Sequence, residues 1–528
     1  MNFRPSTAVL LLISVTSVCH SQTPEVTRIQ EPIFIQETTP AQEPEPVQAK
    51  TKNKLPNILL ILADDLGWKD VGYHGSEIAT PNIDRIAREG VELDRFYAQP
   101  SCSPTRTALM TGKSPRRLGL STPIGKNQKE GIPLEEKLLP QFLKPLGYKN
   151  ILIGKWHLGS HTTPYWPQNR GFDHFYGYLS GGIGYWDHNH GGGHDWQRNG
   201  KTVREEGYST TLLADEAVKL IEAQDKEQPL FLYVSMPAPH LPNEAPEGAI
   251  NKYKHIEKEE RRIHAAMVTQ LDTEIGRVLQ AYQGRGMLEN TIVIFASDNG
   301  GLIYGGLPGL IGNLGKVSAS IFGRPVPINS LEFFASNTFD GGSDNTPLKL
   351  GKGSVAEGGI RVPAAIWWPG QLSSFKHTGM ISASDVLPTI LDITGAIPSN
   401  DESSHQTISF DGISQWAVLN KTEDANTVVS PDYLVTGFRD SKALLRAPWK
   451  LVSDDELELY NVWDDPGEAN NLAKQHPEIV KELNNVMENW PTGKNRGISI
   501  IKNLFDMDSF GGPEDREPWA EAAINRSQ

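Results

Sequence analysis

Four short segments of the chain are hydrophobic at nearly every position. They are NILLILA (57–63), NILIG (150–154), LFLYVS (230–235) and TIVIFAS (291–297). Runs of this length without polar alternation are typical of strands that are buried on both faces of a sheet. Helix-like patterns lie between them, most clearly over 208–223 and 259–283. This alternation predicts an α/β fold with a mostly parallel central sheet that is flanked by helices.

Local signals predict several further elements of this large domain. Thr80-Pro81 is a typical N-cap and first-turn pair, and Gly90 ends the predicted helix. A second helix is expected to follow Cys102 and to end near Gly112. The apolar run AAIWW (364–368) and the helix-like SDVLPTILDIT (384–394) are expected to complete the domain.

Beyond about residue 400 the pattern changes to short segments that resemble antiparallel strands. These are DYLVTGF, ALLRAPWKLV and ELELYNV, and a helix-like stretch over 477–490 follows them. We therefore predict a large domain over 56–400 and a smaller C-terminal α+β domain with an antiparallel sheet over 401–528. Gly-rich inserts at 181–200 and 300–316 are expected to be functional or disordered loops.

The N-terminus has the pattern of an export signal. Arg4 precedes the apolar run AVLLLISV, which is too short to span a bilayer, and cleavage is expected after Ser21. Residues 1–21 are thus predicted to be a signal peptide, and the Pro- and Glu-rich residues 22–55 a disordered spacer. We expect a secreted or periplasmic protein without a transmembrane span; a lipid anchor at Cys19 is the alternative.

Composition narrows the class of protein. The chain has 38% hydrophobic residues and a formal net charge of −14, which favours a soluble globular protein and argues against a general nucleic-acid binder. Its two cysteines are Cys19, inside the predicted signal, and Cys102. A mature exported chain would then hold one thiol, which is either a small buried hydrophobic group or a reactive one.

Polar side chains follow all four predicted buried strands. Asp64 and Asp65 follow the first, Lys155 and His157 the second, His240 the third, and Asp298 and Asn299 the fourth. A single Asp after a strand is most often a turn former. Ligands of open parallel sheets, however, bind beyond the carboxyl ends of the strands, so four such groups predict one functional edge.

The oxygen-bearing members of this set predict a metal site. Asp64, Asp65, Asp298 and Asn299 offer hard oxygen ligands without an accompanying thiolate pair or histidine cluster, which suits Ca²⁺ or Mg²⁺ rather than zinc. We expect one Ca²⁺ per chain, because calcium accepts many protein oxygens in irregular geometry. The alternative is a cation that only stabilises the fold.

Cys102 starts the motif Cys102-Ser103-Pro104-Thr105-Arg106. Because a helix is expected here, the thiol would lie at a helix N-terminus, where anions are favoured. The neighbouring sequence is also basic, at Arg106, Lys113, Arg116, Arg117 and Lys126. These groups would attract an anionic substrate locally despite the net negative charge.

This motif, followed by Thr111-Gly112, resembles the signature of the type I sulfatases. Four further blocks resemble the same family in the same order: PNILLILADDLG (56–67), GKWHLG (154–159), SDNGG (297–301) and NTPLKLGKGSVAEGGIRVP (345–363). The resemblance implies an alkaline-phosphatase-like large domain and makes 56–400 the catalytic domain. It also implies oxidation of Cys102 to a formylglycine nucleophile by a formylglycine-generating maturation enzyme.

The resemblance further implies roles for individual residues. Position 102 joins Asp64, Asp65, Asp298 and Asn299 around the metal, and Arg106 holds the formylglycine hydroxyl. Lys155 and Lys352 bind the sulfate group, His240 assists the leaving alcohol, and His157 accepts a proton when sulfate is expelled. The reaction implied is hydrolysis of a sulfate ester.

Departures from the family pattern bear on the substrate. Ala356 stands where many members carry Trp, Lys349-Leu350 replaces a common Arg-Gly, and an unusually long insert follows Asn299. We expect a sulfated polysaccharide or oligosaccharide, with an algal galactan such as carrageenan as the first choice. Tyr185, Trp186 and Trp196, with His188, His190 and His194, are interpreted as a sugar-contacting rim rather than a second metal site.

Two other functions remain open at this level. A phosphodiesterase or phosphonate hydrolase of the same superfamily would use the same fold and a similar nucleophile. A carbohydrate-binding protein in which Cys102 is never converted would keep the cleft without catalysis. Comparing turnover of matched sulfate and phosphate esters separates these from a sulfatase.

Overall fold

The computed structural model describes residues 54–125, 128–190, 193–303, 341–396, 409–421, 432–497 and 517–528. They belong to one compact unit, Lys54–Gln528. The predicted signal peptide, nearly all of the predicted spacer and most of the insert after Asn299 lie outside the described residues. No helix in the described ranges is long and apolar enough to span a membrane.

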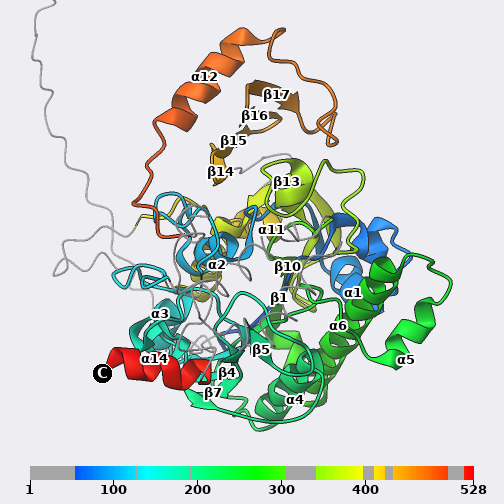
Figure 1. Ribbon diagram of the computed structural model, residues 1–528, viewed down its shortest axis with the longest axis vertical. Helices are drawn as coiled ribbons and strands as arrows, with labels where there is room; N and C mark the ends of the chain where they lie inside the picture. The colour runs from blue at the N-terminus through cyan, green and yellow to red at the C-terminus, as the bar shows by residue number, and fades with distance from the viewer. Residues whose placement is uncertain are drawn as a thin grey trace, which may run out of the picture. The chain divides into compact units, whose positions relative to one another are not determined.

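A central sheet of eleven strands carries the large domain (Figure 1). Its order is β11-β2-β12-β10-β1-β9-β3-β4-β7-β8, and β13 pairs with β2. The neighbours β10, β1, β9, β3 and β4 are mutually parallel, whereas β12 runs antiparallel to β10. The strands are β1 (Asn57–Ala63), β2 (Val91–Tyr97), β3 (Lys149–Lys155), β4 (His174–Tyr178), β7 (Gln197–Arg198), β8 (Lys201–Thr202), β9 (Leu230–Ser235), β10 (Thr291–Ser297), β11 (Arg361–Val362), β12 (Ala364–Trp367) and β13 (Phe375–Ser382).

Helices cover both faces of this sheet, as the unbroken apolar strands predict. Successive residues of a strand point to opposite faces, so alternate residues of β1 enter two separate cores. Leu60 packs in the core that includes α2 (Cys102–Thr111), α3 (Leu139–Leu143), α10 (Val386–Thr394) and α14 (Trp519–Ser527). Ile61 packs in the core that includes α1 (Pro81–Glu89), α4 (Ser209–Glu222) and α6 (Glu259–Gly284).

A separate small sheet follows in the C-terminal part of the chain (Figure 1). It is antiparallel throughout and consists of β14 (Leu434–Phe438), β15 (Ser441–Arg446), β16 (Trp449–Ser453) and β17 (Leu457–Asn461). Leu483 and Met487 of α12 (Pro477–Glu488) pack in a core on one face of this sheet. The predicted change from parallel to antiparallel structure is confirmed, while the exact domain limits stay a prediction.

A buried ion-pair cluster joins the small sheet to the large domain. Lys450 Nζ of β16 lies 3.0 Å from carboxylate oxygens of both Glu357 and Glu468. Glu357 begins α9 (Glu357–Ile360), and the Gly359 carbonyl of this short helix accepts a hydrogen bond from Gly300 N. Buried charges persist only when they are paired. The cluster therefore holds α9 to β16, and the hydrogen bond between Gly300 and Gly359 holds α9 to the residue that follows Asn299.

Short elements complete the description. The remaining α-helices and strands are α5 (Glu247–Ile250), α11 (Trp416–Leu419), β5 (Asn189–His190) and β6 (Gly193–His194). Three-residue or four-residue 3₁₀ turns are η1 (Trp68–Asp70), η2 (Gly72–His74), η3 (Lys144–Leu146), η4 (Thr163–Tyr165), η5 (Pro167–Arg170), η6 (Asn251–Tyr253), η7 (Leu288–Asn290) and η8 (Ala383–Asp385).

The Gly-rich insert at 181–200 differs from the expectation of a structureless loop. Its described residues include β5, β6 and β7, and several of its large side chains are buried. The physical reason is an aromatic core that the glycine content obscures: the Trp196 ring packs edge-on against Tyr176 and stacks against His188. The corresponding insert after Asn299 is described only up to residue 303 and from 341 onward.

Candidate active site

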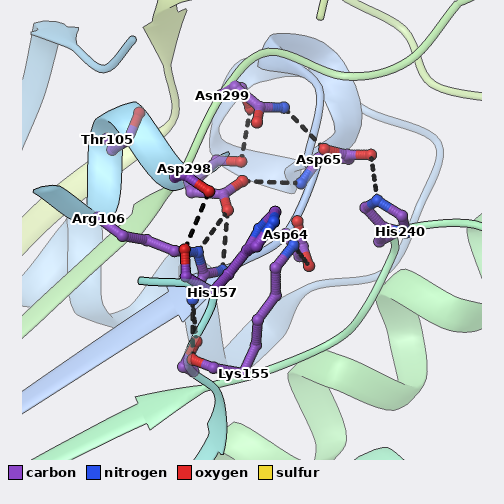
Figure 2. A network of polar contacts seen from close by, with 12 residues as sticks. Asp64, Asp65, Thr105, Arg106, Lys155, His157, His240, Asp298 and Asn299 are labelled. Atoms are coloured by element: carbon purple, nitrogen blue, oxygen red, sulfur yellow. Dashed lines mark hydrogen bonds and ion pairs between the residues drawn. The ribbon is translucent and has the colours of Figure 1, made fainter. Parts of the chain in front are cut away.

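The residues predicted at four strand ends converge at one edge of the sheet (Figure 2). Residues 57–63 of β1 pair in register with residues 291–297 of β10, so Asp64 and Asp298 follow equivalent positions on adjacent parallel strands. Asp298 N donates to the Ala63 carbonyl at 3.0 Å, which continues the pairing past the strand ends. The strand register thus brings together groups that are more than 200 residues apart.

The acidic residues form one buried oxygen cluster. Asp65 N donates to Asp298 Oδ1 at 3.3 Å, and Asn299 Nδ2 donates to Asp65 Oδ1 at 2.7 Å. Potential ligand atoms of Asp64, Cys102 and Asp298 lie within 4.8 Å of one another. Asp64 Oδ1 and Asn299 Oδ1 are buried and have no hydrogen-bond partner in the described structure. Such orphaned oxygens fit a cation, because a buried acceptor without a partner is costly.

Two lysines neutralise part of this cluster. Lys155 Nζ lies 2.7 Å from Asp64 Oδ2, and Lys352 Nζ lies 2.7 Å from a carboxylate oxygen of Asp65. Burial, with Asp298 nearby, raises the pKa of Asp64 to about 8. Burial also opposes ionisation of Asp65, but Lys352 and His240 outweigh it and hold the pKa of Asp65 below its usual range. The two neighbouring carboxyl groups thus have pKa values shifted in opposite directions, although each is paired with a lysine.

Arg106 supplies the third cation and connects three strand ends. Its Nη2 donates to Asp298 Oδ2 at 2.8 Å, and its Nη1 donates to the Lys155 carbonyl at 3.0 Å. Nη1 also lies 2.5 Å from Ser235 Oγ at the end of β9. Arg106 is fully buried. Its planar set of five donors suits this role, which a lysine would not fill.

Cys102 is the first residue of α2 and is only 2% exposed. Burial raises the pKa of its thiol, and Lys155 and Lys352 act against that rise. The next residues fix the surroundings: Ser103 Oγ donates to the His157 carbonyl at 2.9 Å and accepts from Ile124 N at 3.0 Å. Position 102 lies at a helix start, close to Asp64 and Asp298 and within the electrostatic influence of both lysines.

The two histidines are held by backbone carbonyls, which determine their tautomers. His157 Nε2 lies 3.0 Å from the Ile124 carbonyl, so this nitrogen carries a hydrogen and the buried Nδ1 holds a lone pair. Burial, with Lys155 and Arg106 nearby, lowers the pKa of His157 well below its ordinary value. Its Nδ1 is therefore a neutral acceptor.

His240 has the opposite arrangement. Its Nδ1 lies 2.6 Å from the Leu241 carbonyl, so Nδ1 carries the hydrogen. Nε2 lies 3.7 Å from Asp65 Oδ2, facing the oxygen cluster (Figure 2). Burial and Lys352 lower the pKa of His240 below its ordinary value. The two imidazoles thus contact backbone carbonyls through different nitrogens, Nε2 in His157 and Nδ1 in His240.

The predicted sugar-contacting rim needs correction. Tyr185 and Trp196 are both buried. The Tyr185 hydroxyl lies 2.9 Å from the Pro237 carbonyl, and Trp196 Nε1 donates to Glu205 Oε1 at 2.8 Å. Only Trp186 of the three aromatic residues is largely exposed, at 49%. Two other large apolar side chains, Leu134 and Leu350, are exposed to a similar degree.

The histidines of the same segment bind backbone carbonyls. His188 Nε2 contacts the Gly207 carbonyl and His194 Nε2 contacts the Val203 carbonyl. In the described ranges, the groups of three side chains that are spaced for a metal are Asp64, Cys102 and Asp298, and Asp64, Asp65 and His240.

The basic residues after Cys102 are less available than the sequence suggests. Lys113 pairs with Glu136 at 2.7 Å and Arg117 pairs with Asp411 at 2.5 Å. Arg116 is mostly buried beside Gly437, and Lys126 lies outside the described residues. Lys155, Lys352 and Arg106 therefore provide most of the positive charge at the site.

Sequence reasoning missed several residues that shape the site. Ser103 and Ser235 serve as hydrogen-bond partners, and Gly181 and Gly182 lie against the rings of His157 and His240. A Cβ atom at Gly181 would lie 2.7 Å from His157 Cε1, and one at Gly182 would lie 3.0 Å from His240 Cε1. The paired glycines at the start of the 181–200 insert were the available signal.

At the departures from the family pattern, the chain keeps an ordered loop. Ala356 is buried, and Lys349 Nζ lies 5.2 Å from the centre of the Tyr460 ring. Leu350 adopts φ +60° and is exposed. These residues flank Lys352, so an exposed apolar side chain replaces the common glycine beside a site lysine.

One edge of the parallel sheet thus brings a cysteine at a helix start together with buried carboxylates, two lysines and two histidines. This combination is typical of a hydrolase that acts on anionic esters. The family model described as Sulfatase matches residues 56–396, and the chain belongs to this family. It is accordingly a sulfuric ester hydrolase.

Relatives support this assignment over most of the chain. Arylsulfatase J of Mus musculus is 29% identical over 490 residues, which cover 81% of this chain and 74% of that protein. N-acetylgalactosamine-6-sulfatase of Homo sapiens is 32% identical over 371 residues, covering 66% of this chain and 64% of that protein. The crystal structure of Ps i-CgsB in complex with k-i-k-neocarrahexaose has a TM-score of 0.72 at 29% identity and covers 88% of this chain and 99% of that one.

The two tryptophans of the 181–200 segment predict opposite outcomes for stability. Trp196→Ala removes a side chain that is 1% exposed and should lower the free energy of unfolding by about 3–5 kcal/mol. Trp186→Ala removes an exposed ring and should cost about 1 kcal/mol or less. Urea unfolding followed by circular dichroism measures both. Equal losses for the two variants would contradict the assignment of Trp196 to the core.

Proposed function

We propose that this sulfatase removes sulfate groups from a sulfated carbohydrate through a formylglycine at position 102 and a bound calcium ion. The observation that carries the proposal is the placement of Cys102: a buried thiol at a helix start, close to the carboxylates of Asp64 and Asp298 and to two lysines. The relation to named sulfatases supports the same chemistry.

The oxygen cluster is the proposed calcium site. Asp64, Asp65, Asp298 and Asn299 would hold the ion together with residue 102. Orphaned oxygens on Asp64 and Asn299, and the raised pKa of Asp64, favour a cation at this point. When bound, the ion would act as a Lewis acid toward a sulfate oxygen and the nucleophile.

Charge balance explains why such a site would accept an anion. Asp64, Asp65 and Asp298 are offset by Lys155, Lys352 and Arg106, so these six side chains are together neutral when all are ionised. A divalent cation would make the set positive by two charges. Lys155 and Lys352 can then turn their ammonium groups toward the sulfate oxygens, which favours an ester that carries a negative charge.

The histidines divide the proton transfers. His157 has an unprotonated Nδ1 and is assigned to accept a proton from a hydroxyl on residue 102. His240 is assigned to the departing alcohol: in its imidazolium form Nδ1 keeps its contact with the Leu241 carbonyl, and Nε2 carries the second hydrogen, which passes to the leaving oxygen. Formylglycine supplies, in its hydrated form, two hydroxyls on one carbon, one for attack and one for regeneration of the aldehyde.

The substrate proposed is an extracellular sulfated oligosaccharide or polysaccharide. Trp186 is exposed on the segment whose Gly181 and Gly182 lie against the two histidines, so its ring is available to stack on a sugar. The related structure that contains k-i-k-neocarrahexaose supports a carrageenan as first choice. An export signal over residues 1–21 and a secreted or periplasmic location fit this substrate and are part of the proposal.

Sulfate release from a panel of substrates tests the function. We expect the enzyme to prefer at least one sulfated oligosaccharide to 4-nitrophenyl sulfate in kcat/KM, and to hydrolyse 4-nitrophenyl phosphate more slowly than the matched sulfate. Trp186→Ala should lower kcat/KM for the preferred glycan by about tenfold and leave the aryl sulfate nearly unchanged. Equal efficiency on the aryl sulfate and every glycan, with no effect of Trp186→Ala, would contradict the carbohydrate proposal.

Conversion of Cys102 has its own test. Protein from a host that oxidises sulfatases should carry formylglycine at position 102, detected by peptide mass spectrometry. Cys102→Ala should fold with nearly normal stability yet lose activity by at least about 10³-fold, because it lacks the nucleophile. Fully active protein with only unmodified Cys102 would rule out the formylglycine mechanism and leave the fold assignment intact.

The cation requirement is testable by removal. Dialysis against a chelator should abolish activity and added Ca²⁺ should restore it, with bound calcium measured by elemental analysis. Asp298→Ala should reduce both calcium content and activity far more than Asp173→Ala, whose carboxylate forms an exposed pair with Lys144. Full activity in protein shown to be metal-free would refute the calcium proposal.

A further inference from the structure

The residues that hold His240 in place come from two segments. The first is its own turn: His240 N donates to the Pro237 carbonyl at 3.0 Å, and the Ala238 carbonyl accepts from Asp64 N at 3.2 Å. The turn is thus already tied to the first residue of the oxygen cluster. The second segment, Gly181–Tyr185, follows β4 and contacts both the ring and the turn.

Tyr185 contributes the polar contacts of the second segment. Its buried hydroxyl lies 2.9 Å from the Pro237 carbonyl and 2.9 Å from the His240 carbonyl, so its hydrogen is donated to the first and last residues of the same turn. The ring is stacked on Tyr208 with centroids 5.1 Å apart, and Tyr185 N donates to Glu244 Oε2 at 2.8 Å. Tyr185 is therefore fixed independently of His240.

Gly182 completes the contact from the other side. A Cβ atom at this residue would lie 3.0 Å from His240 Cε1 and 3.2 Å from His240 Nδ1, so the backbone packs directly on the edge of the imidazole. The ring has little room to rotate away from the Leu241 carbonyl that fixes its tautomer. Backbone, tautomer and ring orientation are thus each restrained by a separate contact.

From this arrangement we infer that Tyr185 is a positioning residue that acts through His240 on departure of the alcohol. The inference rests on the proposed role of His240 at the leaving oxygen. Tyr185 itself does not touch the oxygen cluster, because its hydroxyl faces the carbonyls of the turn. A small displacement of the turn would move Nε2 relative to the leaving oxygen, and geometry of this kind has large effects on rate.

The test compares esters that differ in how much help the leaving group needs. With substituted phenyl sulfates from 4-nitrophenyl to 4-methylphenyl, Tyr185→Phe should lower kcat/KM by about tenfold for the poor leaving group and by less than about twofold for 4-nitrophenyl sulfate. Tyr208→Phe is the matched control. It removes a buried hydroxyl from the same stacked pair, one that donates to the Glu244 carbonyl instead, and should show no such dependence.

A double variant shows whether Tyr185 acts through His240. In a His240→Ala background, Tyr185→Phe should add less than about twofold to the loss on any ester, since the group it positions is absent. An equal loss across the ester series, or a full additional loss in the His240→Ala background, would overturn the inference while the wild-type enzyme remains an active sulfatase. A wild-type enzyme that releases no sulfate from any ester would overturn the proposed function and this inference with it.

Discussion

The buried ion pair between Arg106 and Asp298 is the interaction on which the active-site edge depends. Arg106 lies four residues after Cys102 on α2, so both side chains project from the same face of the helix. By binding Asp298, the Lys155 carbonyl and Ser235, the guanidinium aligns this helix with the ends of three strands. Breaking such a pair leaves an uncompensated buried charge, at a cost of about 3–5 kcal/mol.

The same constraint explains why so many charges can be buried together. Strand register forces carboxylates side by side, and burial together with repulsion from Asp298 raises the pKa of Asp64. Each is offset by a different cation: Lys155 for Asp64, Lys352 for Asp65 and Arg106 for Asp298. The pairing leaves Asp64 Oδ1 and Asn299 Oδ1 without a hydrogen-bond partner in the described structure, so the hydrogen-bonding capacity of this edge is not saturated. A site that binds both a cation and an anionic ester needs this combination.

Much of this arrangement could be predicted from the sequence, for a physical reason. Strands buried on both faces are apolar without interruption, and parallel strands deliver the residues that follow them to one edge. β1, β9 and β10 therefore have the predicted limits, and Asp64, Lys155, His240 and Asp298 meet as expected. β2 was missed because charged residues interrupt VELDRFY, and α14 because a short amphipathic segment near the end of the chain gives a weak signal.

Tyr185 and Trp196 could not be placed correctly, because an aromatic residue in a Gly-rich segment has the same composition whether it faces solvent or a core. Their burial depends on partners that are distant in the chain, such as Pro237 for Tyr185. The tautomers of His157 and His240 were also beyond sequence reasoning, since single backbone carbonyls determine them. Contacts to the main chain leave no trace in the identity of the partner residue.

The depth of Cys102 has a consequence for the order of events in the life of the protein. At 2% exposure, in a helix whose residues are all buried, its sulfur is out of reach of another protein's catalytic groups once α2 has packed. Any enzyme that modifies this residue must therefore act on the chain before this part of the fold closes. Such a modification and folding would then compete in time, and a chain that folded first would keep the unmodified thiol.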